Sequence, residues 1–320
     1  MVEVIAECCQ NHNGDIAVLE EMVHQAAAAG ATYAKIQSMQ AVEELTHRPR
    51  FDEGVVRNGV TEVIKRPFGA ELERLRKLDL SDEQHRRFLE TCRAAGIKPM
   101  TTVFTRARIP FVASLGLDTI KVASFDCASF PMLRELRAAG PHRIIVSTGV
   151  TFDEEVEQAI ALLRDGPLAV LHCVSIYPTP LEEAHLDRLD YLRELCPAVG
   201  LSDHSNPERD GEKMSAAGLL KGARIIEKHF TVLPKDKTRD GPVSANFEQL
   251  KRLVELSRLP PDDLRAYVRE RVPEYETMLG DRRRALGPTE LLNRDYYRGR
   301  FASRTPQGEW IYNWEERLLA

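Results

Sequence analysis

The stretches Gly200-Leu-Ser-Asp-His-Ser205 and Ile225-Ile-Glu-Lys-His-Phe-Thr231 each contain a short apolar run that ends in a histidine. Each run is typical of a buried strand, and the residues between the two runs are enough for one helix with its turns. Such units predict neighbouring parallel strands, whose carboxyl ends lie at the same edge of a sheet. His204 and His229 would then lie side by side, where two imidazoles could hold one divalent metal.

The same alternation of strands and helices extends over most of the chain. Apolar, β-branched-rich runs predict strands at residues 2–7, 33–37, 98–102, 119–122, 143–148, 168–173, 198–202 and 224–229. Amphipathic segments predict helices at residues 16–29, 81–95, 106–115, 130–138, 152–164, 186–195, 211–220 and 247–256. Capping boxes are expected at Ser81 with Gln84 and at Thr151 with Glu154, and left-handed glycines at Gly30, Gly96 and Gly140.

Eight strand–helix units that end near residue 256 predict an α/β fold, a (β/α)8 TIM barrel. An open doubly wound sheet is the alternative, but no Gly-x-Gly-x-x-Gly motif follows the first predicted strand. We therefore expect a barrel domain over residues 1–259 and a charged helical extension over residues 260–320. The extension could be the remnant of an accessory domain or an oligomer contact.

Residues 38–80 form a connection far longer than strand–helix loops usually are, at the edge where TIM barrels hold their sites. We expect this loop to be a lid or a substrate wall, with a tolerated surface insertion as the alternative. Among its basic residues are His47, Arg48, Arg50, Arg57, Lys65 and Arg66.

The composition argues against several classes of protein. The 320 residues are 43% hydrophobic, which is enough for a sizeable core, and the net charge of -5 argues against a broad nucleic-acid surface. No apolar run approaches the roughly 20 residues that span a bilayer, and the first residues resemble a strand rather than a signal peptide. The six cysteines show no Cys-x-x-Cys spacing and are expected to be reduced thiols. We therefore expect a cytoplasmic protein with no membrane and no nucleic-acid partner.

Polar residues recur at the carboxyl ends of the predicted strands. They are Glu7, Lys35, Gln37, Thr102, Lys121, Ser124, Asp126, Ser147, Thr148, His172, Ser175, Tyr177, Ser202, His204 and His229. Capping or solvent exposure explains any one of them alone, but closure of the barrel would bring all of them into one basin. Two lysines with several hydroxyls make an anion pocket that suits a phosphate or a carboxylate.

In combination, these motifs resemble the sialic acid synthase family, the phosphoenolpyruvate-condensing synthases that make nonulosonic acids. The resemblance covers roughly residues 1–250, in the family's order. The matching stretches are Ile5-Ala-Glu-Cys-Cys-Gln-Asn-His-Asn-Gly14, Ala34-Lys-Ile-Gln37, Thr101-Thr-Val-Phe-Thr105, Ile120-Lys-Val-Ala-Ser124, Val146-Ser-Thr-Gly149, Leu171-His-Cys-Val-Ser-Ile-Tyr-Pro-Thr-Pro180, and the two histidine stretches above. The resemblance implies a transferase that condenses phosphoenolpyruvate with a sugar aldehyde. The products would be a 2-keto-3-deoxy acid and phosphate, formed by C–O cleavage.

The resemblance also implies roles for individual residues. His204 and His229 would bind the divalent metal, expected to be Mn²⁺ with Mg²⁺ or Co²⁺ as alternatives. The residues at phosphoenolpyruvate-binding positions are Lys35, Thr102, Lys121, Ser124, Ser147, Ser175 and Ser202. The residues near the acceptor sugar or the reacting atoms are Glu7, Gln37, Asp126 and Tyr177. Of these, Glu7, Asp126 and the phosphate-binding Lys121 are the candidate catalytic residues, and either acid could handle the proton of the attacking water.

Departures from the family pattern lie on the acceptor side. Val243 stands where the family usually has an aspartate, which leaves Asp240 or Asn246 as substitutes. Cys8 and Cys9 stand where the family usually has Ile-Gly, and a nucleophilic role for a cysteine there is disfavoured because the adjacent Glu7 would raise a thiol pKa.

Residues 281–320 resemble the linker and the first strand of the family's C-terminal antifreeze-like domain. The arm that usually reaches into the partner subunit of the expected homodimer would then be missing. We therefore expect an unusual acceptor aldehyde, either anionic or nucleoside-derived. The arginines of the long loop that could supply the lost contacts are Arg48, Arg50, Arg57 and Arg66.

Two other functions compete with this condensation. One is a pyruvate aldolase or lyase on the same barrel, in which Lys121 would form a Schiff base. The other is a barrel that binds a ligand or a partner without catalysis. Release of phosphate from phosphoenolpyruvate that depends on a metal and an aldehyde would separate all three.

Overall fold

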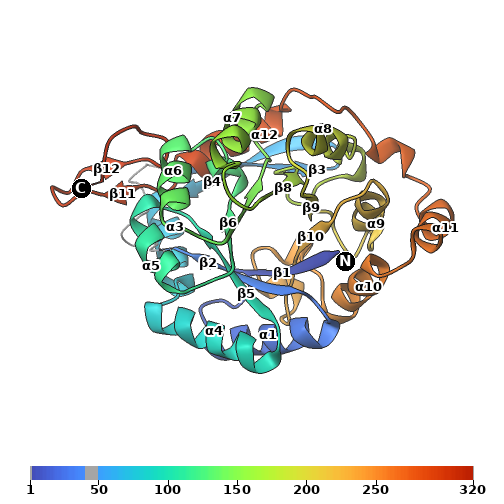
Figure 1. The fold of residues 1–320 in the computed structure, drawn as a ribbon, viewed down its shortest axis with the longest axis horizontal. Coiled ribbons are helices and arrows are strands. Elements are labelled where there is room, and N and C mark those ends of the chain that lie inside the picture. The colour runs from blue at the N-terminus through green and yellow to red at the C-terminus, as the bar shows by residue number, and fades with distance from the viewer. Residues whose placement is uncertain (1, 40–49, 320) are drawn as a thin grey trace.

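The protein folds as a closed barrel of parallel strands surrounded by helices (Figure 1), seen in a computed structural model that describes residues 2–39 and 50–319. The order around the barrel is β1-β10-β9-β8-β7-β6-β5-β2. The bounds are β1 (Glu3–Cys9), β2 (Tyr33–Ser38), β5 (Lys98–Val103), β6 (Thr119–Val122), β7 (Arg143–Ser147), β8 (Leu168–Cys173), β9 (Val199–Asp203) and β10 (Ile225–His229). This confirms the predicted (β/α)8 TIM barrel.

The outer helices follow the predicted ranges to within about two residues, apart from one that is split. They are α1 (Ile16–Ala29), α4 (Asp82–Ala95), α5 (Ile109–Ser114), α6 (Phe130–Ala138), α7 (Asp153–Leu163), α8 (Arg188–Leu195), α9 (Lys213–Leu220) and α10 (Phe247–Ser257). A 3₁₀ turn at Arg106–Arg108 precedes α5, so the helix predicted at 106–115 is split.

Some helix ends are capped by the residues predicted for them. The capping box at Ser81 is confirmed, and Gly30, Gly96 and Gly140 take positive φ values as expected. The box predicted at Thr151 is wrong, because the hydroxyl of Thr151 donates to backbone carbonyls, and Glu155 instead accepts from the N–H of Phe152.

Two apolar layers hold the barrel together. Leucine, isoleucine and valine side chains fill the space between strands and helices. A second, smaller cluster fills the inside of the barrel, with members Ile5, Tyr33, Met100, Ile145, Ala169, Leu171 and Ile225. The barrel is therefore a packed core rather than a pore, and polar side chains can gather only above this floor.

The long connection after β2 forms a β-hairpin and a helix in its described part. The hairpin consists of β3 (Arg50–Arg57) and β4 (Val60–Pro67), and α3 (Phe68–Leu78) follows it. Asn58 and Gly59 both have positive φ at the two-residue turn, as a type I′ hairpin requires. His47 and Arg48 lie outside the described residues.

The chain after α10 returns across the outside of the barrel to the hairpin (Figure 1). It contains α11 (Pro261–Arg271), α12 (Pro288–Arg298) and a small antiparallel pair, β11 (Ser303–Arg304) with β12 (Trp310–Ile311). Helix α12 packs against β3 and against the 3₁₀ turn Ser124–Asp126. The domain boundary near residue 259 stays a prediction. In the described residues, no helix is long and apolar enough to cross a membrane.

Candidate active site

A pocket opens at the carboxyl end of the barrel, and strand alternation explains which side chains reach it. Residues two apart in a strand share a face. Most of the side chains that line the pocket follow this spacing in the strands or just past their ends: Lys35 and Gln37, Thr102 and Phe104, Lys121 and Ala123, Cys173 and Ser175, Ser202 and His204, and Glu227 and His229. Glu7 and Ser147 reach the pocket from β1 and β7, and Cys9 reaches it beyond a shift in the register of β1. Ser124 and Tyr177 also line the pocket, so it includes every predicted site residue except Asp126.

Two buried lysines form the cationic floor of this pocket. Lys35 Nζ lies 3.0 Å from Thr102 Oγ1, and Lys121 Nζ lies 2.7 Å from Ser147 Oγ. Glu227 lies between them, with its carboxylate 3.6 Å from Lys35 Nζ and 3.8 Å from Lys121 Nζ. Glu227 was not among the predicted site residues, although alternation along β10 places it on the same face as His229.

The charges of this floor depend on one another. Burial lowers the pKa of Lys35 to about 7, although Glu227 opposes that shift. Burial alone would raise the pKa of Glu227, but Lys121 and Lys35 outweigh it and lower that pKa to about 2. The carboxylate is thus ionised at neutral pH, whereas Lys35 can gain or lose a proton there.

Glu7 is the carboxylate nearest to Lys35. Its Oε2 contacts Lys35 Nζ, and both side chains are almost completely buried. In the parallel register, Glu7 pairs with Lys35 on one side and with His229 on the other. This position between the lysine floor and the histidines suits an acid that handles a proton near the reacting atoms.

Three of the polar residues at the predicted strand ends do not line the pocket in the described chain. Asp126 lies in the 3₁₀ turn after β6, where it accepts hydrogen bonds from Ser129 and Asn313. Burial raises the pKa of Asp126 to about 6 despite these donors. His172 Nε2 bonds to the backbone oxygen of Ala184, and Thr148 bonds to that of Leu171. The structure therefore does not support proton transfer by Asp126.

The two histidines that end β9 and β10 face one another, with ring centroids 5.3 Å apart. His204 Nδ1 lies 3.0 Å from the backbone oxygen of Val174. Because a carbonyl oxygen only accepts, Nδ1 must carry the hydrogen, and in the neutral ring this leaves a lone pair on Nε2. Metal-binding histidines are usually oriented in this way, through a hydrogen bond from the other ring nitrogen.

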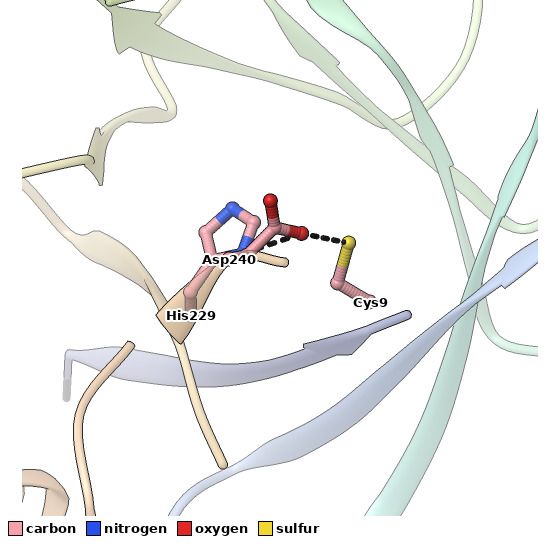
Figure 2. Close-up of side chains that lie close together, drawn as sticks. All are labelled: Cys9, His229 and Asp240. Atoms are coloured by element: carbon pink, nitrogen blue, oxygen red, sulfur yellow. Dashed lines mark hydrogen bonds and ion pairs between the residues drawn. The ribbon is translucent and has the colours of Figure 1, made fainter. Parts of the chain in front are cut away.

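His229 fits a metal for a different reason. Among the residues that the structure describes, its Nδ1 has no hydrogen-bond partner, although the atom is buried. The carboxylate of Asp240 lies 3.8 Å away, and Figure 2 shows it between His229 and Cys9. A buried nitrogen beside a carboxylate and a thiol is a donor set that suits a divalent metal.

Asp240 takes a place near the histidines that the sequence left open. It lines the pocket, whereas Asn246 caps α10 through the N–H of Gln249. Val243 is buried in the 3₁₀ turn Gly241–Val243. Of the two predicted substitutes for the missing aspartate, Asp240 is therefore the one in the site.

The outer wall of the pocket comes from residues that were not among the predicted site residues. Four aromatic residues line it, Phe104, Phe125, Tyr297 and Phe301, and the Phe125 and Tyr297 rings stack with centroids 5.3 Å apart. Tyr297 and Phe301 belong to the chain after residue 260, which was expected only to be a remnant or an oligomer contact.

Three arginines complete this wall: Arg74 from α3, Arg239 from the loop after β10, and Arg300 from the C-terminal segment. Arg74 donates a hydrogen bond to the buried Glu71 at 2.8 Å, and Arg300 forms an ion pair with the same carboxylate at 2.9 Å. The loop arginines predicted for this role are elsewhere in the described chain, because Arg57 pairs with the exposed Glu62 and Arg66 pairs with Glu53. Arg48 lies outside the described residues, and the side chain of Arg50 is not described.

Comparison with known proteins finds relatives that match most of this chain. A model of the NeuB family matches residues 22–260. The N,N'-diacetyllegionaminic acid synthase of Legionella pneumophila is 32% identical over 80% of this chain and 71% of its own. A pseudaminic acid synthase of Campylobacter jejuni is 28% identical over 95% of this chain and 82% of its own.

A solved structure of similar fold is the N-acetylneuraminic acid synthetase of Leptospira borgpetersenii in complex with citrate. It is 25% identical to this chain with a TM-score of 0.70, and the match covers 83% of this chain and 85% of that one.

Proposed function

Since this chain belongs to the NeuB family, we propose that it condenses phosphoenolpyruvate with a sugar aldehyde to give a 2-keto-3-deoxy acid and phosphate. The observation that carries the proposal is the buried cationic floor, in which Lys35 and Lys121 lie among hydroxyls at the base of an open pocket. Relatives named as synthases of legionaminic and pseudaminic acids support this reaction class.

The floor suits the phosphate and the carboxylate of phosphoenolpyruvate. Two ammonium groups supply charge, and hydroxyls that contact them supply directed donors. The hydroxyl side chains that line the pocket are Thr102, Ser124, Ser147, Ser175 and Ser202. Groups fixed on rigid strands can orient C3 of the enol toward an aldehyde without reorganisation.

The reaction forms one carbon–carbon bond and breaks one carbon–oxygen bond. The electron pair of the enol forms the bond from C3 to the aldehyde carbon, and the aldehyde oxygen takes up a proton. Water adds at C2 and loses a proton, and the carboxylate of Glu7, which contacts Lys35 in the pocket, would accept that proton as a base. The bridging oxygen then leaves with phosphate as the C2 ketone forms.

A divalent metal fits beside the histidines. His204 and His229 would hold it, and it would supply Lewis-acid polarisation of the aldehyde. The resemblance favours Mn²⁺, with Mg²⁺ or Co²⁺ as alternatives. We expect His204→Ala and His229→Ala each to abolish turnover while the circular dichroism spectrum stays native, and wild-type rates in either variant would contradict the metal role.

The outer wall supports an anionic or planar acceptor. Arg74, Arg239 and Arg300 outnumber the glutamates Glu53 and Glu71 that pair with them, so this wall keeps a positive charge. The stacked Phe125 and Tyr297 present aromatic surface to a base or to the apolar face of a sugar. We therefore propose an anionic or nucleoside-derived aldehyde as the acceptor, and a homodimer as the assembly that the resemblance implies.

The test is incubation of the full chain with phosphoenolpyruvate that carries ¹⁸O at the bridging oxygen, Mn²⁺ and a panel of aldehydes. The panel contains neutral hexosamines, uronic acids, sugar phosphates and nucleoside aldehydes, and products are identified by mass spectrometry. We expect aldehyde-dependent release of ¹⁸O-labelled phosphate and a product three carbons longer than the aldehyde. If only N-acetylmannosamine reacts, the acceptor proposal is wrong. Covalent trapping of pyruvate on Lys121 by borohydride would instead identify a Schiff-base enzyme.

A further inference from the structure

Cys9, Asp240 and His229 bring one sulfur, one oxygen and one nitrogen atom together in the pocket (Figure 2). The three ligand atoms all lie within 4.8 Å of one another, and Cys9 Sγ is 2.8 Å from Asp240 Oδ2. Tetrahedral metal–ligand bonds of about 2.0 to 2.3 Å place such ligand atoms about 3.3 to 3.7 Å apart. Small side-chain rotations would therefore bring all three onto one ion.

The backbone at Cys9 is shaped to aim this thiol. Cys9 has a φ of 47°, in the left-handed region that a side chain other than glycine rarely adopts. The register between β1 and β2 shifts between Glu7 and Cys9, so the regular alternation of β1 is interrupted just before this side chain. Strained backbone positions of this kind occur mainly at functional sites, so the strain at Cys9 suggests a function for its thiol in the pocket.

A chain of hydrogen bonds from an arginine points an amide N–H at the sulfur. Arg74 Nη1 donates to Gln10 Oε1 at 2.7 Å, and Gln10 Nε2 donates to Gln37 Oε1 at 3.3 Å. Because the Arg74 guanidinium can only donate, it fixes the side-chain oxygen of Gln10 as the acceptor, and this in turn fixes the orientation of the Gln37 amide. Gln37 Nε2 therefore donates to Cys9 Sγ at 3.0 Å. An N–H donor on the sulfur stabilises a metal-bound thiolate.

The third ligand atom, His229 Nδ1, is buried without a hydrogen-bond partner in the described chain. His229 as a whole is only 7% exposed. Asp240 Oδ2 lies 3.8 Å from this nitrogen, beyond hydrogen-bonding distance. An ion between Asp240 and Cys9 would satisfy this nitrogen.

We propose that Cys9, as a thiolate, and Asp240 join His229 as ligands of the metal in this pocket. The inference rests on the proposed function, because it names ligands of the metal that the condensation would use. As the metal–sulfur bond forms, the thiol proton passes to solvent, and no oxidation is involved. A thiolate ligand favours Zn²⁺ or Co²⁺ over the harder Mn²⁺, so this site departs from the manganese preference expected above.

The test is a titration of the metal-free full chain with Co²⁺ alone, followed by absorption spectroscopy. A thiolate on cobalt gives a sulfur-to-metal charge-transfer band in the near ultraviolet. We expect this band in the wild type, saturating at one ion per chain, and bleaching when Zn²⁺ but not equimolar Mn²⁺ is added. Cys9→Gly, which also removes the strain at positive φ, should lose the band, and Asp240→Asn should weaken Co²⁺ binding at least tenfold.

Two cysteines provide matched controls. Cys8 is the neighbouring residue but packs in the outer core, and Cys173 is the other thiol that lines the pocket, with Sγ 3.7 Å from His204 Nδ1. Cys8→Ala and Cys173→Ala should both keep the band. No band in the wild type, or a band that survives in a folded Cys9→Gly variant, would overturn the proposal. Turnover is assayed separately from metal binding. A charge-transfer band without condensation would contradict only the proposed function. Condensation without the band would contradict only this set of metal ligands.

Discussion

Glu227 is the residue that makes two buried lysines compatible with one another. It lies between Lys35 and Lys121 and accepts a hydrogen bond from Ser202 at 3.0 Å. Glu227→Gln would remove the carboxylate that the two ammonium groups share and would leave Glu7 beside Lys35 alone, so we expect the free energy of unfolding to fall by about 3 kcal/mol. Urea denaturation followed by circular dichroism measures this loss.

The same substitution has a second consequence and a simple control. A phosphate bound between the lysines would replace the missing charge, so saturating phosphate should stabilise Glu227→Gln more than it stabilises the wild type. Glu73→Gln removes a carboxylate from an exposed i,i+3 pair with Arg76 and should change stability by less than about 0.5 kcal/mol. Equal losses of stability in the two variants would show that Glu227 stabilises the fold no more than an exposed ion pair does.

Lys35 should make phosphoenolpyruvate binding depend on pH. Burial lowers its pKa to about 7, and Glu7, Glu227 and Lys121 are the charged groups around it. The Lys35 ammonium is charged below that pKa, so its attraction for phosphoenolpyruvate is lost as the pH rises through 7. The phosphate of the ligand, with a second pKa near 6, stays dianionic over this range. Because the bound anion favours the ammonium, binding should take up a proton and weaken by up to about tenfold per pH unit above 7.

Calorimetry of phosphoenolpyruvate binding between pH 7 and 9, in two buffers of different ionisation enthalpy, measures this proton uptake. Lys35→Gln should bind weakly and without uptake. Lys65→Gln changes an exposed lysine of the hairpin and should leave the pH profile unaltered. A flat profile in the wild type would mean that Lys35 stays charged throughout this range.

At the scale of elements, the strands and most helices could be predicted because their signals are local. Apolar runs and caps fixed all eight barrel strands to within about two residues. Asp126 was misplaced because β6 ends at Val122, and in the 3₁₀ turn that follows residues no longer alternate between two faces. Glu227, in contrast, sits inside a regular strand and follows the alternation that places His229.

The outer wall could not be predicted, because its contacts join distant parts of the chain. Tyr297 stacks on Phe125, and Arg300 pairs with Glu71, which is more than two hundred residues away in sequence. Helix α12 has an ordinary amphipathic pattern, and this pattern does not indicate which surface of the protein the helix packs against. Only the closed barrel brings the hairpin and α12 to the same rim.

Asn293 holds α12 in place. Its Nδ2 donates to the backbone oxygens of Gly54 and Ser175, and its Oδ1 accepts from the N–H of Gly54 at 2.7 Å. Asn293→Ala would leave these buried groups unpaired and should cost about 3 kcal/mol of stability. We expect the KM for the acceptor to rise severalfold, since Tyr297 lies on the same helix, while phosphoenolpyruvate binding changes less than twofold.

Leu291→Ala is the matched control on α12, because this side chain is 46% exposed. It should leave both stability and acceptor KM near wild type. A rise in the Kd of phosphoenolpyruvate as large as the rise in acceptor KM would show that α12 supports the whole pocket rather than its outer wall. Steady-state kinetics and ligand titration of the folded variants decide between these outcomes.

On the scale of the whole molecule, every barrel strand supplies at least one side chain to the pocket. The C-terminal segment is tied to the same structure, because Asn313 Nδ2 donates to Phe104 oxygen at 2.8 Å and to Asp126 at 2.9 Å. Arg106 also donates to the backbone oxygens of Glu315 and Arg317. The buried Asp126, which lacks a place in the pocket, therefore helps to anchor this segment to the barrel.

This arrangement predicts that barrel and C-terminal segment unfold together. The only two tryptophans of the sequence, Trp310 and Trp314, both lie in that segment, so their fluorescence reports on it while far-ultraviolet circular dichroism reports mainly on the barrel. We expect the two urea transitions to coincide and phosphoenolpyruvate at 100 times its Kd to stabilise both by about 2.7 kcal/mol. If the fluorescence transition came first and did not respond to the ligand, the segment would be a separate unit, and an acceptor wall built from Tyr297 and Arg300 would have to form only when the acceptor binds.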